Sequence, residues 1–576
     1  MTGLVVMGFF ALFLFFAMLG SISTAKSARV VEKHSILKIE LTGTLSERIE
    51  ENPLAEVFGI DQLQQQGLNT LLSALNKAAT DNNIDGIYLE GGTLAADYAS
   101  AQELRKAIVD FKKSKKFVIA YGEQFSQLAY YIATAADTVL LNPSGMVDLH
   151  GIASEPIFYK ELLDKVGVKM QVFRVGTYKS AVEPFIATEM SPANREQITS
   201  FCTDIWSFIG QDIAAARKID TTRLNQIIND YVLLADAKDL VENHLVDGLL
   251  YADQLRDRLR ALTTHDKVVF ASPSDLLSDT DELSARSSAH IAIYYAEGEI
   301  VDQRTTSGFS NTSEIVGSDV VKDLDELAND DNVKAVVLRV NSPGGSAYAS
   351  EQMWRAVQVL REKKPVVVSM GGLAASGGYY LSCGADYIIS EPTTLTGSIG
   401  IFGLIPDVSG LLTEKIGLHF DVVKTHEASD MGAMRRGFNA GESAALQAYV
   451  ERGYGLFLSR VAEGRKKSTQ QIDSIAQGRV WTGHQALSIG LVDKLGTLAD
   501  AVAEATRRAK MENLATVGYP AAKSWIEKLA NVSENSFLEN QLRAALGIYY
   551  RPLRFAYSIE GRDMLQARLP FEPNVR

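Results

Sequence analysis

Cysteine is almost absent from this sequence, and so is any excess of positive charge. Cys202 and Cys383 are the two cysteines among 576 residues, too few for a disulfide framework or for a zinc site built on cysteines. The formal net charge is −13, which argues against nucleic acid as a partner because phosphate binding needs clustered lysine and arginine. We expect no nucleic-acid partner, no metal and no cofactor.

One long apolar run stands at the start of the chain. Residues 4–22 contain a single polar side chain, Ser21, and as a helix they would measure about 28 Å, close to the thickness of a bilayer core. A cleaved signal peptide is the alternative, but its apolar region usually has about 7–15 residues and follows a positively charged start. We therefore predict a retained N-terminal membrane anchor within residues 1–30.

The chain contains two copies of one unit. Three pairs of segments match in the same order: residues 96–122 with 346–371, 129–145 with 378–394, and 245–260 with 491–506. The offset between the copies stays at 250, 249 and 246 residues, which indicates a tandem duplication. We place the repeats at 31–285 and 286–525, with a polar linker at 272–288, and a tail without counterpart at 526–576.

Apolar strands alternate with helices in each repeat. In the second repeat the pattern predicts strands at 333–340, 365–370 and 387–390, and a helix at 346–364. Such alternation is typical of layered α/β units with largely parallel sheets.

Two strand-to-helix junctions in the second repeat carry the candidate chemistry. At 341–346, NSPGGS, two glycines let a ligand approach the backbone closely, and free N–H groups at a helix start stabilise developing negative charge. Ser376 follows the next strand, among small residues. Because parallel strands end at one edge of a sheet, the N–H groups of Gly345 and Gly377 could form an oxyanion hole beside Ser376. A plain turn at 341–346 and a helix N-cap at Ser376 are the structural alternatives.

A general base for Ser376 is not evident near either junction. None of the eight histidines lies there. His426, in a predicted loop, is the best histidine candidate, although a lone loop histidine is more often simply solvated. The other common activator of serine is a neutral lysine, whose pKa must fall from about 10.4 through burial or neighbouring positive charge.

Four segments closely resemble motifs of the signal peptide peptidase A family, in its long, tandem-repeat bacterial form. They are FRVGTYKSAVEPF at 173–185, RVNSPGGSAYASE at 339–351, GGLAASGGYYLS at 371–382 and TLTGSIGIFG at 394–403. The resemblance implies an α/β fold of two tandem Clp protease/crotonase-like repeats preceded by a transmembrane helix. It also implies a serine protease that uses a Ser-Lys dyad.

The resemblance gives a role to each candidate residue. Ser376 matches the nucleophile and Lys179 matches the general base. Gly345 and Gly377 match the backbone N–H donors of the oxyanion hole, and Ser398 matches a serine that orients the lysine. A solvated surface position for Lys179 and an ordinary turn at Ser398 are the alternatives.

The duplication favours a site shared between the repeats. The first repeat has Gln127 where the second has its serine, and Leu94 and Ala95 where the second has its glycine pair. Conversely, the second repeat has Ala428 where the first repeat has Lys179. We therefore expect one composite site at the contact between repeats, formed within one chain or between two.

The function implied by the resemblance is that of a membrane-anchored serine endopeptidase. Its substrates would be the hydrophobic signal peptides left in the membrane after release from secreted preproteins, and its anchor would contact membrane lipid. The resemblance further implies a homotetramer at the bacterial inner membrane with a periplasmic catalytic body. Lys26, Arg29 and Lys33 follow the apolar run and by charge alone favour a cytoplasmic body.

Two other classes of function stay open at this point. A crotonase-like acyl-CoA enzyme shares the fold, but it would need a CoA pocket and no serine nucleophile. A non-catalytic membrane scaffold is the other, since the first repeat has already lost its nucleophile.

Overall fold

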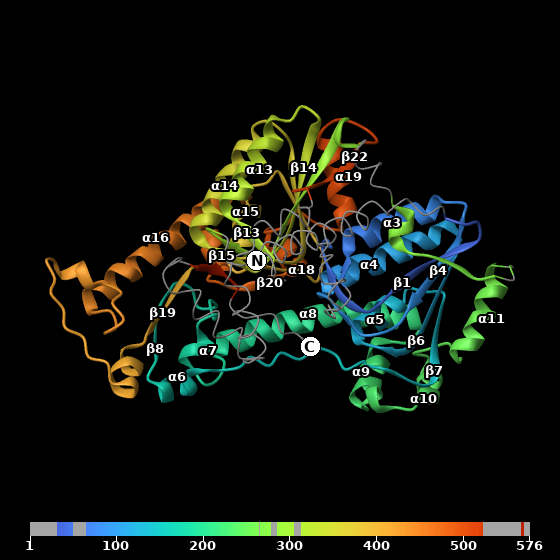
Figure 1. Cartoon of the computed structure of the whole chain (residues 1–576), viewed down its shortest axis with the longest axis horizontal. Helices are drawn as coiled ribbons and strands as arrows, with labels where there is room; N and C mark the ends of the chain where they lie inside the picture. The colour runs from blue at the N-terminus through green and yellow to red at the C-terminus, as the bar shows by residue number, and fades with distance from the viewer. Residues whose placement is uncertain are drawn as a thin grey trace, which may run out of the picture.

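The computed structural model describes residues 31–49, 65–263, 265, 267–277, 285–303, 313–521 and 566–569. The predicted membrane anchor at 1–30 lies outside these residues. Within the described ranges, no helix is both long enough and apolar enough to cross a membrane. Two sheet-based units, one from each repeat, lie side by side (Figure 1).

The first unit is built on a parallel sheet of six strands, in the order β10-β1-β4-β6-β7-β9. In chain order these strands are β1 (Ser35–Glu40), β4 (Ile84–Glu90), β6 (Phe117–Phe125), β7 (Thr138–Val147), β9 (Gly248–Leu249) and β10 (Val269–Ala271). Successive strand residues point to opposite faces, so Ile87 and Leu89 join one core cluster and Tyr88 joins another. Both faces of the sheet are therefore covered, as is usual for parallel sheets.

Helices cover the two faces of this sheet unequally. One face carries α3 (Leu68–Thr80), α4 (Tyr98–Phe111) and α5 (Gln127–Ala133), and the other carries α11 (Ala252–Thr263). A small second sheet joins β2 (Gly43–Ser46), β3 (Gln65–Gly67) and β5 (Leu94–Ala95).

The second unit repeats this plan on an eight-stranded sheet. Its main path is β20-β18-β16-β14-β11-β22, and β17 and β21 branch from β16. The strands are β11 (His290–Glu297), β14 (Val333–Ser342), β16 (Val366–Ala375), β17 (Tyr387–Ser390), β18 (Leu395–Gly397), β20 (Val480–Thr482), β21 (Lys494–Leu495) and β22 (Ala515–Tyr519). All pairs are parallel except β18 with β20. The strands predicted around 333–340, 365–370 and 387–390 are confirmed.

The helices of the second unit also lie on both faces of its sheet. One face carries α13 (Gly317–Asn329), α14 (Ala347–Arg361) and α15 (Gly377–Ser382), and the other carries α19 (Leu498–Arg508). The helix α14 begins where Ser346 accepts a hydrogen bond from the Ala349 N–H, as N-cap serines do. Its apolar residues recur at helical spacing and are buried. The helix predicted at 346–364 is therefore confirmed, three residues shorter at its end.

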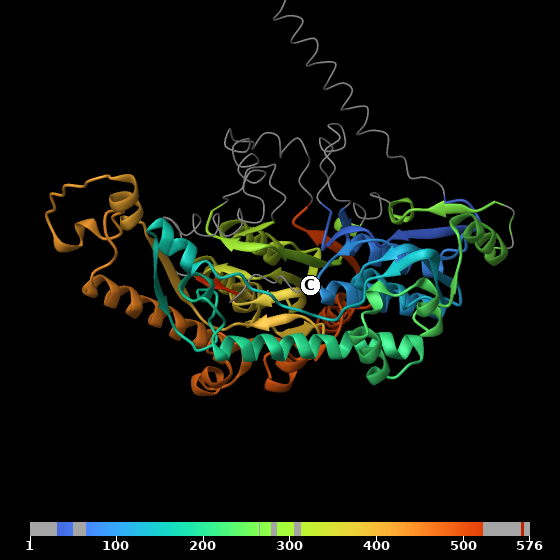
Figure 2. The same ribbon diagram turned by 90° about the horizontal axis from the view of Figure 1, so that it is seen from below.

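A third sheet ties the two units together. Its order is β13-β12-β15-β23-β19-β8, and it contains β8 (Lys169–Arg174) from the first repeat and β19 (Phe402–Asp407) from the second, paired antiparallel. The others are β12 (Glu299–Val301), β13 (Glu314–Val316), β15 (Gly344–Ser346) and β23 (Gln566–Arg568). The long helix α8 (Pro192–Arg217) runs beneath both units (Figure 2), and its Gln197 accepts a hydrogen bond from the Val480 N–H of the second repeat. The repeats thus meet within one chain.

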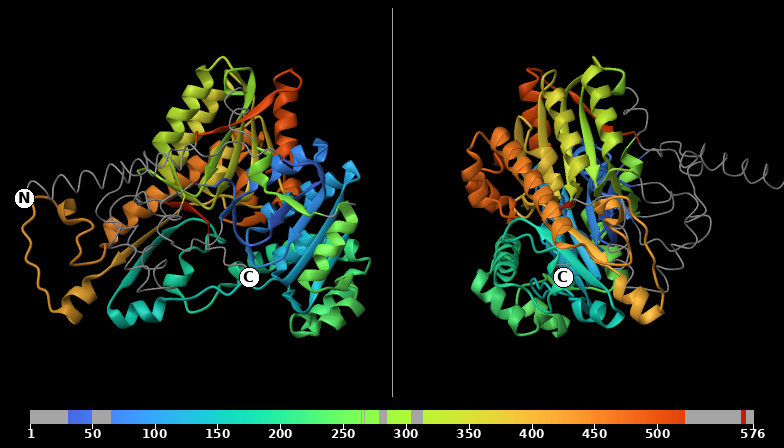
Figure 3. Two further views of the ribbon diagram at one scale, coloured as in Figure 1. Left: turned by 45° about the vertical axis from the view of Figure 1, so that its right-hand side comes forward. Right: turned by 90° about the vertical axis from the view of Figure 1, so that its left-hand side faces the viewer.

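The connections outside these sheets are mostly helical. In the first repeat they are α6 (Lys160–Val166), α7 (Glu183–Ile186), α9 (Thr221–Asn229) and α10 (Ala237–Glu242); in the second they are α16 (Ala440–Arg465), α17 (Thr469–Ile475) and α18 (Gly483–Ile489). The segment between β19 and α16 extends away from the sheets (Figure 3) and carries exposed apolar side chains, including Leu418, Phe420 and Val423.

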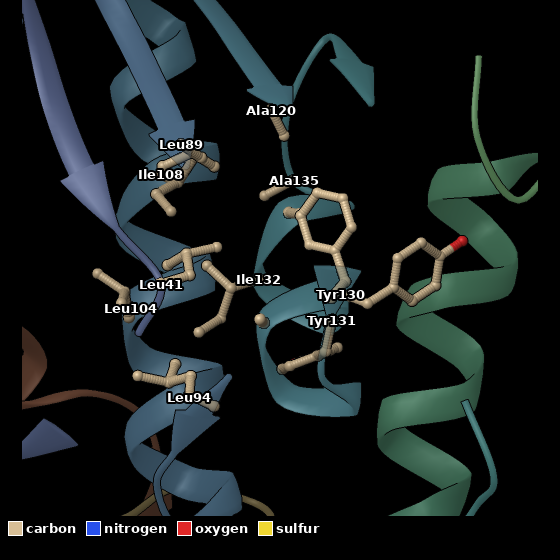
Figure 4. Close-up of a cluster of buried hydrophobic side chains, with 14 of the residues drawn as sticks. Leu41, Leu89, Leu94, Leu104, Ile108, Ala120, Tyr130, Tyr131, Ile132 and Ala135 are labelled. Carbon is tan, nitrogen blue, oxygen red and sulfur yellow. The ribbon is translucent and has the colours of Figure 1, made fainter. Parts of the chain in front are cut away.

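The core of the first unit is filled from α4 and α5. Leu104 and Ile108 of α4 pack near Ile132 of α5, and Tyr130 and Tyr131 of α5 are buried in the same cluster (Figure 4). The Tyr130 hydroxyl donates a buried hydrogen bond of 2.7 Å to the Leu245 carbonyl, so the polar end of this ring is satisfied inside the core.

A fully buried arginine joins the two units. The Arg339 guanidinium on β14 donates to Glu47 at 2.9 Å and to Glu103 at 2.6 Å, and both carboxylates belong to the first repeat. Its third contact is the Ser369 hydroxyl at 2.9 Å, on β16. Because charges out of water are tolerated only when they are paired and hydrogen-bonded, docking of the repeats is what makes burial of this arginine possible.

Replacing Arg339 tests this connection. Arg339→Met leaves two buried carboxylates without their cation, and we expect the free energy of unfolding to fall by about 3–5 kcal/mol. Urea denaturation of the purified chain measures the change, and Arg258→Met on the exposed face of α11 is the matched control. A loss below about 1 kcal/mol would show that the pairing contributes little.

Candidate active site

Ser376 lies at the junction of β16 and α15, in a backbone conformation that is rare for serine. Its φ of 54° and ψ of −111° fall in the strained region that non-glycine residues seldom occupy. The conformation is held from both sides, because the Ser376 N–H donates to the Gly397 carbonyl and its own carbonyl accepts from the Tyr380 N–H, each at 2.8 Å. Ser376 stands at the N-cap position of α15, but its hydroxyl makes no helix-capping hydrogen bond, so capping does not occupy this hydroxyl.

Lys179 reaches this hydroxyl from the first repeat. Its Nζ lies 2.8 Å from the Ser376 Oγ, 3.0 Å from the Ser398 Oγ and 3.1 Å from the Ser398 carbonyl oxygen. Lys179 is 0% exposed, so the interpretation as a solvated surface lysine is wrong. The structure brings all three of these predicted residues together within one chain.

Burial determines the protonation state of Lys179. Desolvation lowers the pKa of the Lys179 ammonium well below its usual value, because burial disfavours the charged form of the amine. A neutral amine has two N–H donors and one lone pair. The two oxygens of Ser398 can accept both donors, which leaves the lone pair facing the Ser376 hydroxyl. This arrangement is suited to removing the hydroxyl proton.

Ser398 is placed by the short strand β18. It follows Gly397, has a φ of 49° and is completely buried. Its N–H donates to the Arg479 carbonyl at 2.7 Å, which fixes both of its oxygens relative to Lys179. Ser398 is therefore buried, held in an unusual backbone conformation and in contact with Lys179, which an ordinary turn serine would not require.

The glycine turn at 341–346 lies directly against Ser376. Gly344 has a φ of 97°, and a Cβ on it would lie 2.7 Å from the Gly377 nitrogen. A Cβ on Gly345 would lie 2.0 Å from the Ile300 carbonyl oxygen, so neither position has room for a side chain. Gly344 and Gly345 belong to the strand β15 rather than to a plain turn, and Gly344 lies directly against the nitrogen of Gly377, one of the two predicted oxyanion donors.

The loop that carries Lys179 packs against a turn of the second repeat. The Tyr178 N–H donates to the Gln477 carbonyl at 2.8 Å. A Cβ on Gly478 would lie 2.6 Å from the Lys179 Cβ, and one on Gly400 would lie 3.2 Å from its Cδ. The absence of side chains at these two glycines lets the lysine enter. Sequence reasoning gave neither a role: Gly400 lies within the motif at 394–403 but was not singled out there, and Gly478 lies outside the four motifs.

A buried polar network supports the residue after Lys179. The Ser180 hydroxyl donates to Asn194 at 2.8 Å and accepts from Gln197 at 2.8 Å, and both partners lie on α8. Gln197 also reaches the second repeat through Val480. Asn194 and Gln197 are polar residues on the buried face of α8. This is the one feature of the sequence that marks the network, and it can be recognised only when the buried face of the helix is known.

Gln127 and His426, the two other residues considered in the sequence, take no part in this site. Gln127 stands at the start of α5 and accepts hydrogen bonds from the His150 and Gly151 N–H groups at 3.0 and 2.8 Å. The first repeat therefore has a hydrogen-bonded amide at the position where the second repeat has Ser376.

His426 is exposed on the segment that extends beyond β19, where it contacts the neighbouring Thr425. The structure does not bring His426 to Ser376.

Comparison with known proteins supports the fold described above. The sequence model described as "Peptidase family S49" matches residues 110–266 and 358–512, and that described as "Clp protease" matches residues 290–393. The α/β fold with tandem Clp protease-like units is thereby confirmed.

Two of the similar proteins cover most of the chain, and a third covers a little less than half of it. "Protease 4" of Salmonella typhi is 40% identical over 79% of this chain and 75% of its own. "Serine protease SPPA, chloroplastic" of Arabidopsis thaliana is 30% identical over 84% of this chain and 70% of its own. "Putative signal peptide peptidase SppA" of Enterococcus faecium is 31% identical over 46% of this chain and 78% of its own.

The burial of Lys179 predicts a pH-dependent stability. Its pKa is lower in the folded than in the unfolded chain, so between these two pKa values the unfolded chain binds one more proton and stability rises with pH. Lys179→Met removes the buried amine at similar volume. We expect this variant to be more stable than the parent near neutral pH, by about 1.4 kcal/mol for each unit of pKa depression, and the difference to shrink as pH approaches 10.

Urea denaturation at several pH values between 7 and 10 measures both effects. Lys322→Met, at an exposed position of α13, is the control for loss of a lysine charge. A Lys179→Met variant that is less stable than the parent at every pH would contradict the neutral, buried amine.

Proposed function

The chain belongs to peptidase family S49 and is a serine protease, and from this membership we propose that Ser376 is its nucleophile and Lys179 its general base. The observation that carries the proposal is the 2.8 Å contact between the Lys179 Nζ and the Ser376 Oγ inside a buried site. An acyl-CoA enzyme would not need this serine, and a scaffold would not need the buried amine. The family and this contact together argue against both alternatives.

Acylation begins with the Ser376 hydroxyl. Its proton moves to the Lys179 lone pair while Oγ attacks the peptide carbonyl carbon, and a tetrahedral oxyanion forms. The N–H groups of Gly345 and Gly377 stabilise this oxyanion, since preorganised donors are most effective in a site that excludes water. The ammonium of Lys179 then gives its proton to the leaving amine as the C–N bond breaks.

Deacylation reverses the same proton path. Lys179 accepts a proton from water, the resulting hydroxide attacks the acyl ester, and Ser376 regains its proton when the carboxylic product leaves. Ser398 acts as a positioning residue throughout, because its two oxygens fix the direction of the Lys179 lone pair. Burial keeps the amine neutral between these steps.

The substrates we propose are remnant hydrophobic signal peptides. Support comes from the four motifs that resemble the signal peptide peptidase A family and from the relative that bears that name. A membrane anchor at residues 4–22 would hold the site close to peptides released into a bilayer. By the same resemblance, the catalytic body would lie on the periplasmic side of a bacterial inner membrane.

Assembly as a homotetramer is part of the same proposal. The segment after β19 exposes Ile416, Leu418, Phe420 and Val423, the last of them fully. Apolar side chains gathered on one exposed segment are typical of a surface that another subunit covers. The molecular mass of the detergent-solubilised chain, measured by light scattering, tests this arrangement.

Substitution of the dyad tests the mechanism. With a hydrophobic signal-peptide-like substrate in detergent, we expect Ser376→Ala and Lys179→Ala each to reduce kcat by about 10³-fold or more, because the two groups act as a unit. His426→Ala should retain the parental rate, since this side chain is exposed on a distant segment. A fluorophosphonate probe should label Ser376 in the parent and in His426→Ala. Full activity of Lys179→Ala would exclude the lysine as base.

The pH dependence of the rate tests the neutral amine. Because the base acts in its deprotonated form, kcat/KM should rise with pH through the Lys179 pKa and reach its plateau below the ordinary lysine value. Ser398→Ala removes one of the two groups that direct the amine, and we expect kcat to fall by about 10-fold or more with little change in KM. An unchanged kcat in Ser398→Ala would show that the carbonyl of residue 398 alone is sufficient.

A further inference from the structure

A turn of the second repeat, residues 477–479, contacts both the proposed general base and the serine that directs it. The carbonyls of its first and last residues accept hydrogen bonds from the Tyr178 N–H at 2.8 Å and from the Ser398 N–H at 2.7 Å. Between them, Gly478 leaves room for Lys179, because a Cβ on this glycine would lie 2.6 Å from the Lys179 Cβ. The turn therefore determines where the amine and its partner lie relative to each other.

The backbone of this turn is held in a conformation that its sequence does not favour. Gln477 has a φ of 54° and Gly478 a φ of 77°, and the first of these values is uncommon for a residue with a side chain. The Gln477 amide donates to the Asp473 carboxylate at 2.7 Å, and the Gly478 N–H donates to the Ile399 carbonyl at 2.9 Å. These hydrogen bonds stabilise the turn, so that it is a fixed support for the segments that contact it.

The side chain of Arg479 joins the turn to the residue that precedes Lys179. The Arg479 guanidinium lies 4.8 Å from the centre of the Tyr178 ring and donates to the Tyr178 hydroxyl at 3.1 Å. It also donates to the Glu196 carboxylate at 2.8 Å, and the Tyr178 hydroxyl donates to the same carboxylate at 3.1 Å. Because Tyr178 and Glu196 both belong to the first repeat, these three side chains connect the two repeats directly beside the amine.

Ion pairing alone does not account for the position of Arg479. Its guanidinium also lies 4.3 Å from the centre of the Trp481 ring, whose N–H donates to the Ile475 carbonyl at 2.9 Å. The Arg479 Nε is buried and has no hydrogen-bond partner among the residues that the structure describes. Since a buried donor without a partner costs free energy, a surface ion pair would not require this placement. Packing of the planar guanidinium against the two rings explains it.

We propose that Arg479 is a positioning residue for the general base. Its carbonyl orients Ser398, and its side chain holds Tyr178 against the turn, so that the neighbouring Lys179 stays directed at Ser376 and out of contact with water. This inference rests on the proposed function, because it assigns Arg479 a part in the same dyad.

Two substitutions in the full chain test this role. Arg479→Met keeps the backbone carbonyl and an unbranched side chain but removes the guanidinium, and Tyr178→Phe keeps the ring but removes the hydroxyl. We expect Arg479→Met to lower kcat by about 10-fold to 100-fold with little change in KM, because misplacing a catalytic group slows the reaction without weakening substrate binding. Tyr178→Phe should lower kcat less. Arg507→Met, which removes an exposed arginine of α19 that pairs with Glu504 on the same helix, is the control and should behave as the parent.

The pH profile distinguishes positioning from a merely structural role. In Arg479→Met the rise of kcat/KM should occur at higher pH than in the parent, because water that reaches the loosened loop stabilises the Lys179 ammonium and returns its pKa toward the ordinary value. Tyr178→Phe should shift the midpoint in the same direction by a smaller amount. A loss of folded enzyme alone would lower the rate at every pH and leave this midpoint where it is.

The double variant shows whether the two side chains act together. Since the Tyr178 hydroxyl and the Arg479 guanidinium contact each other, the loss of kcat in the double variant should be smaller than the product of the two single losses. A loss equal to that product would show that the two side chains act independently, and would contradict the proposed coupling.

The outcomes separate this inference from the proposed function. If the parent neither cleaves peptide nor reacts with a fluorophosphonate at Ser376, the proposed function is wrong and this inference is wrong with it. If the parent is active but Arg479→Met keeps the parental kcat and pH midpoint, the dyad stands and the positioning role is overturned. A lower kcat with an unmoved midpoint would equally overturn it. If Arg479→Met fails to fold, Tyr178→Phe decides the question by the same two measurements, because it removes a single hydroxyl.

Discussion

The exclusion of water from one lysine is the constraint on which the site depends. Lys179 belongs to the first repeat, yet the groups that surround its amine, Ser376 and Ser398, belong to the second. Separation of the repeats would return this amine to water and restore its ordinary pKa. On the proposed mechanism the chemistry therefore depends on the contact between the repeats, since each repeat supplies only part of the dyad.

The ion pairs of Arg339 with Glu47 and Glu103 are a second buried contact between the two repeats. Glu47 contacts Arg339 and also approaches Gly371, where a Cβ would lie 2.5 Å from its carboxylate. Burial raises the pKa of Glu47 and raises that of the neighbouring Glu297 to about 8, and repulsion from nearby carboxylates adds to both shifts. Through Glu47, the first repeat thus contacts both β14 and β16, the strands that lead to the glycine pair at 344–345 and to Ser376.

The sequence was most informative where chemistry and local structure coincide. The junctions at 341–346 and at Ser376 could be predicted because small residues directly follow apolar strands. Lys179 could be chosen only through a family resemblance, since its burial results from glycines almost 300 residues away, such as Gly478. The third sheet escaped prediction for a related reason. Its strands, β15 and β23 among them, are short and come from distant segments, so no local periodicity marks them.

Gln127 occupies, in the first repeat, the position that Ser376 has in the second. Its side chain is held by the N–H groups of His150 and Gly151, and its own amide donates to the Gly151 carbonyl and the Tyr98 hydroxyl. Substitution of Gln127 by serine would supply neither a glycine pair nor a lysine partner in the first repeat. On the proposed mechanism, each chain therefore has one catalytic site, and a larger number of sites requires more chains rather than a second site in the same chain.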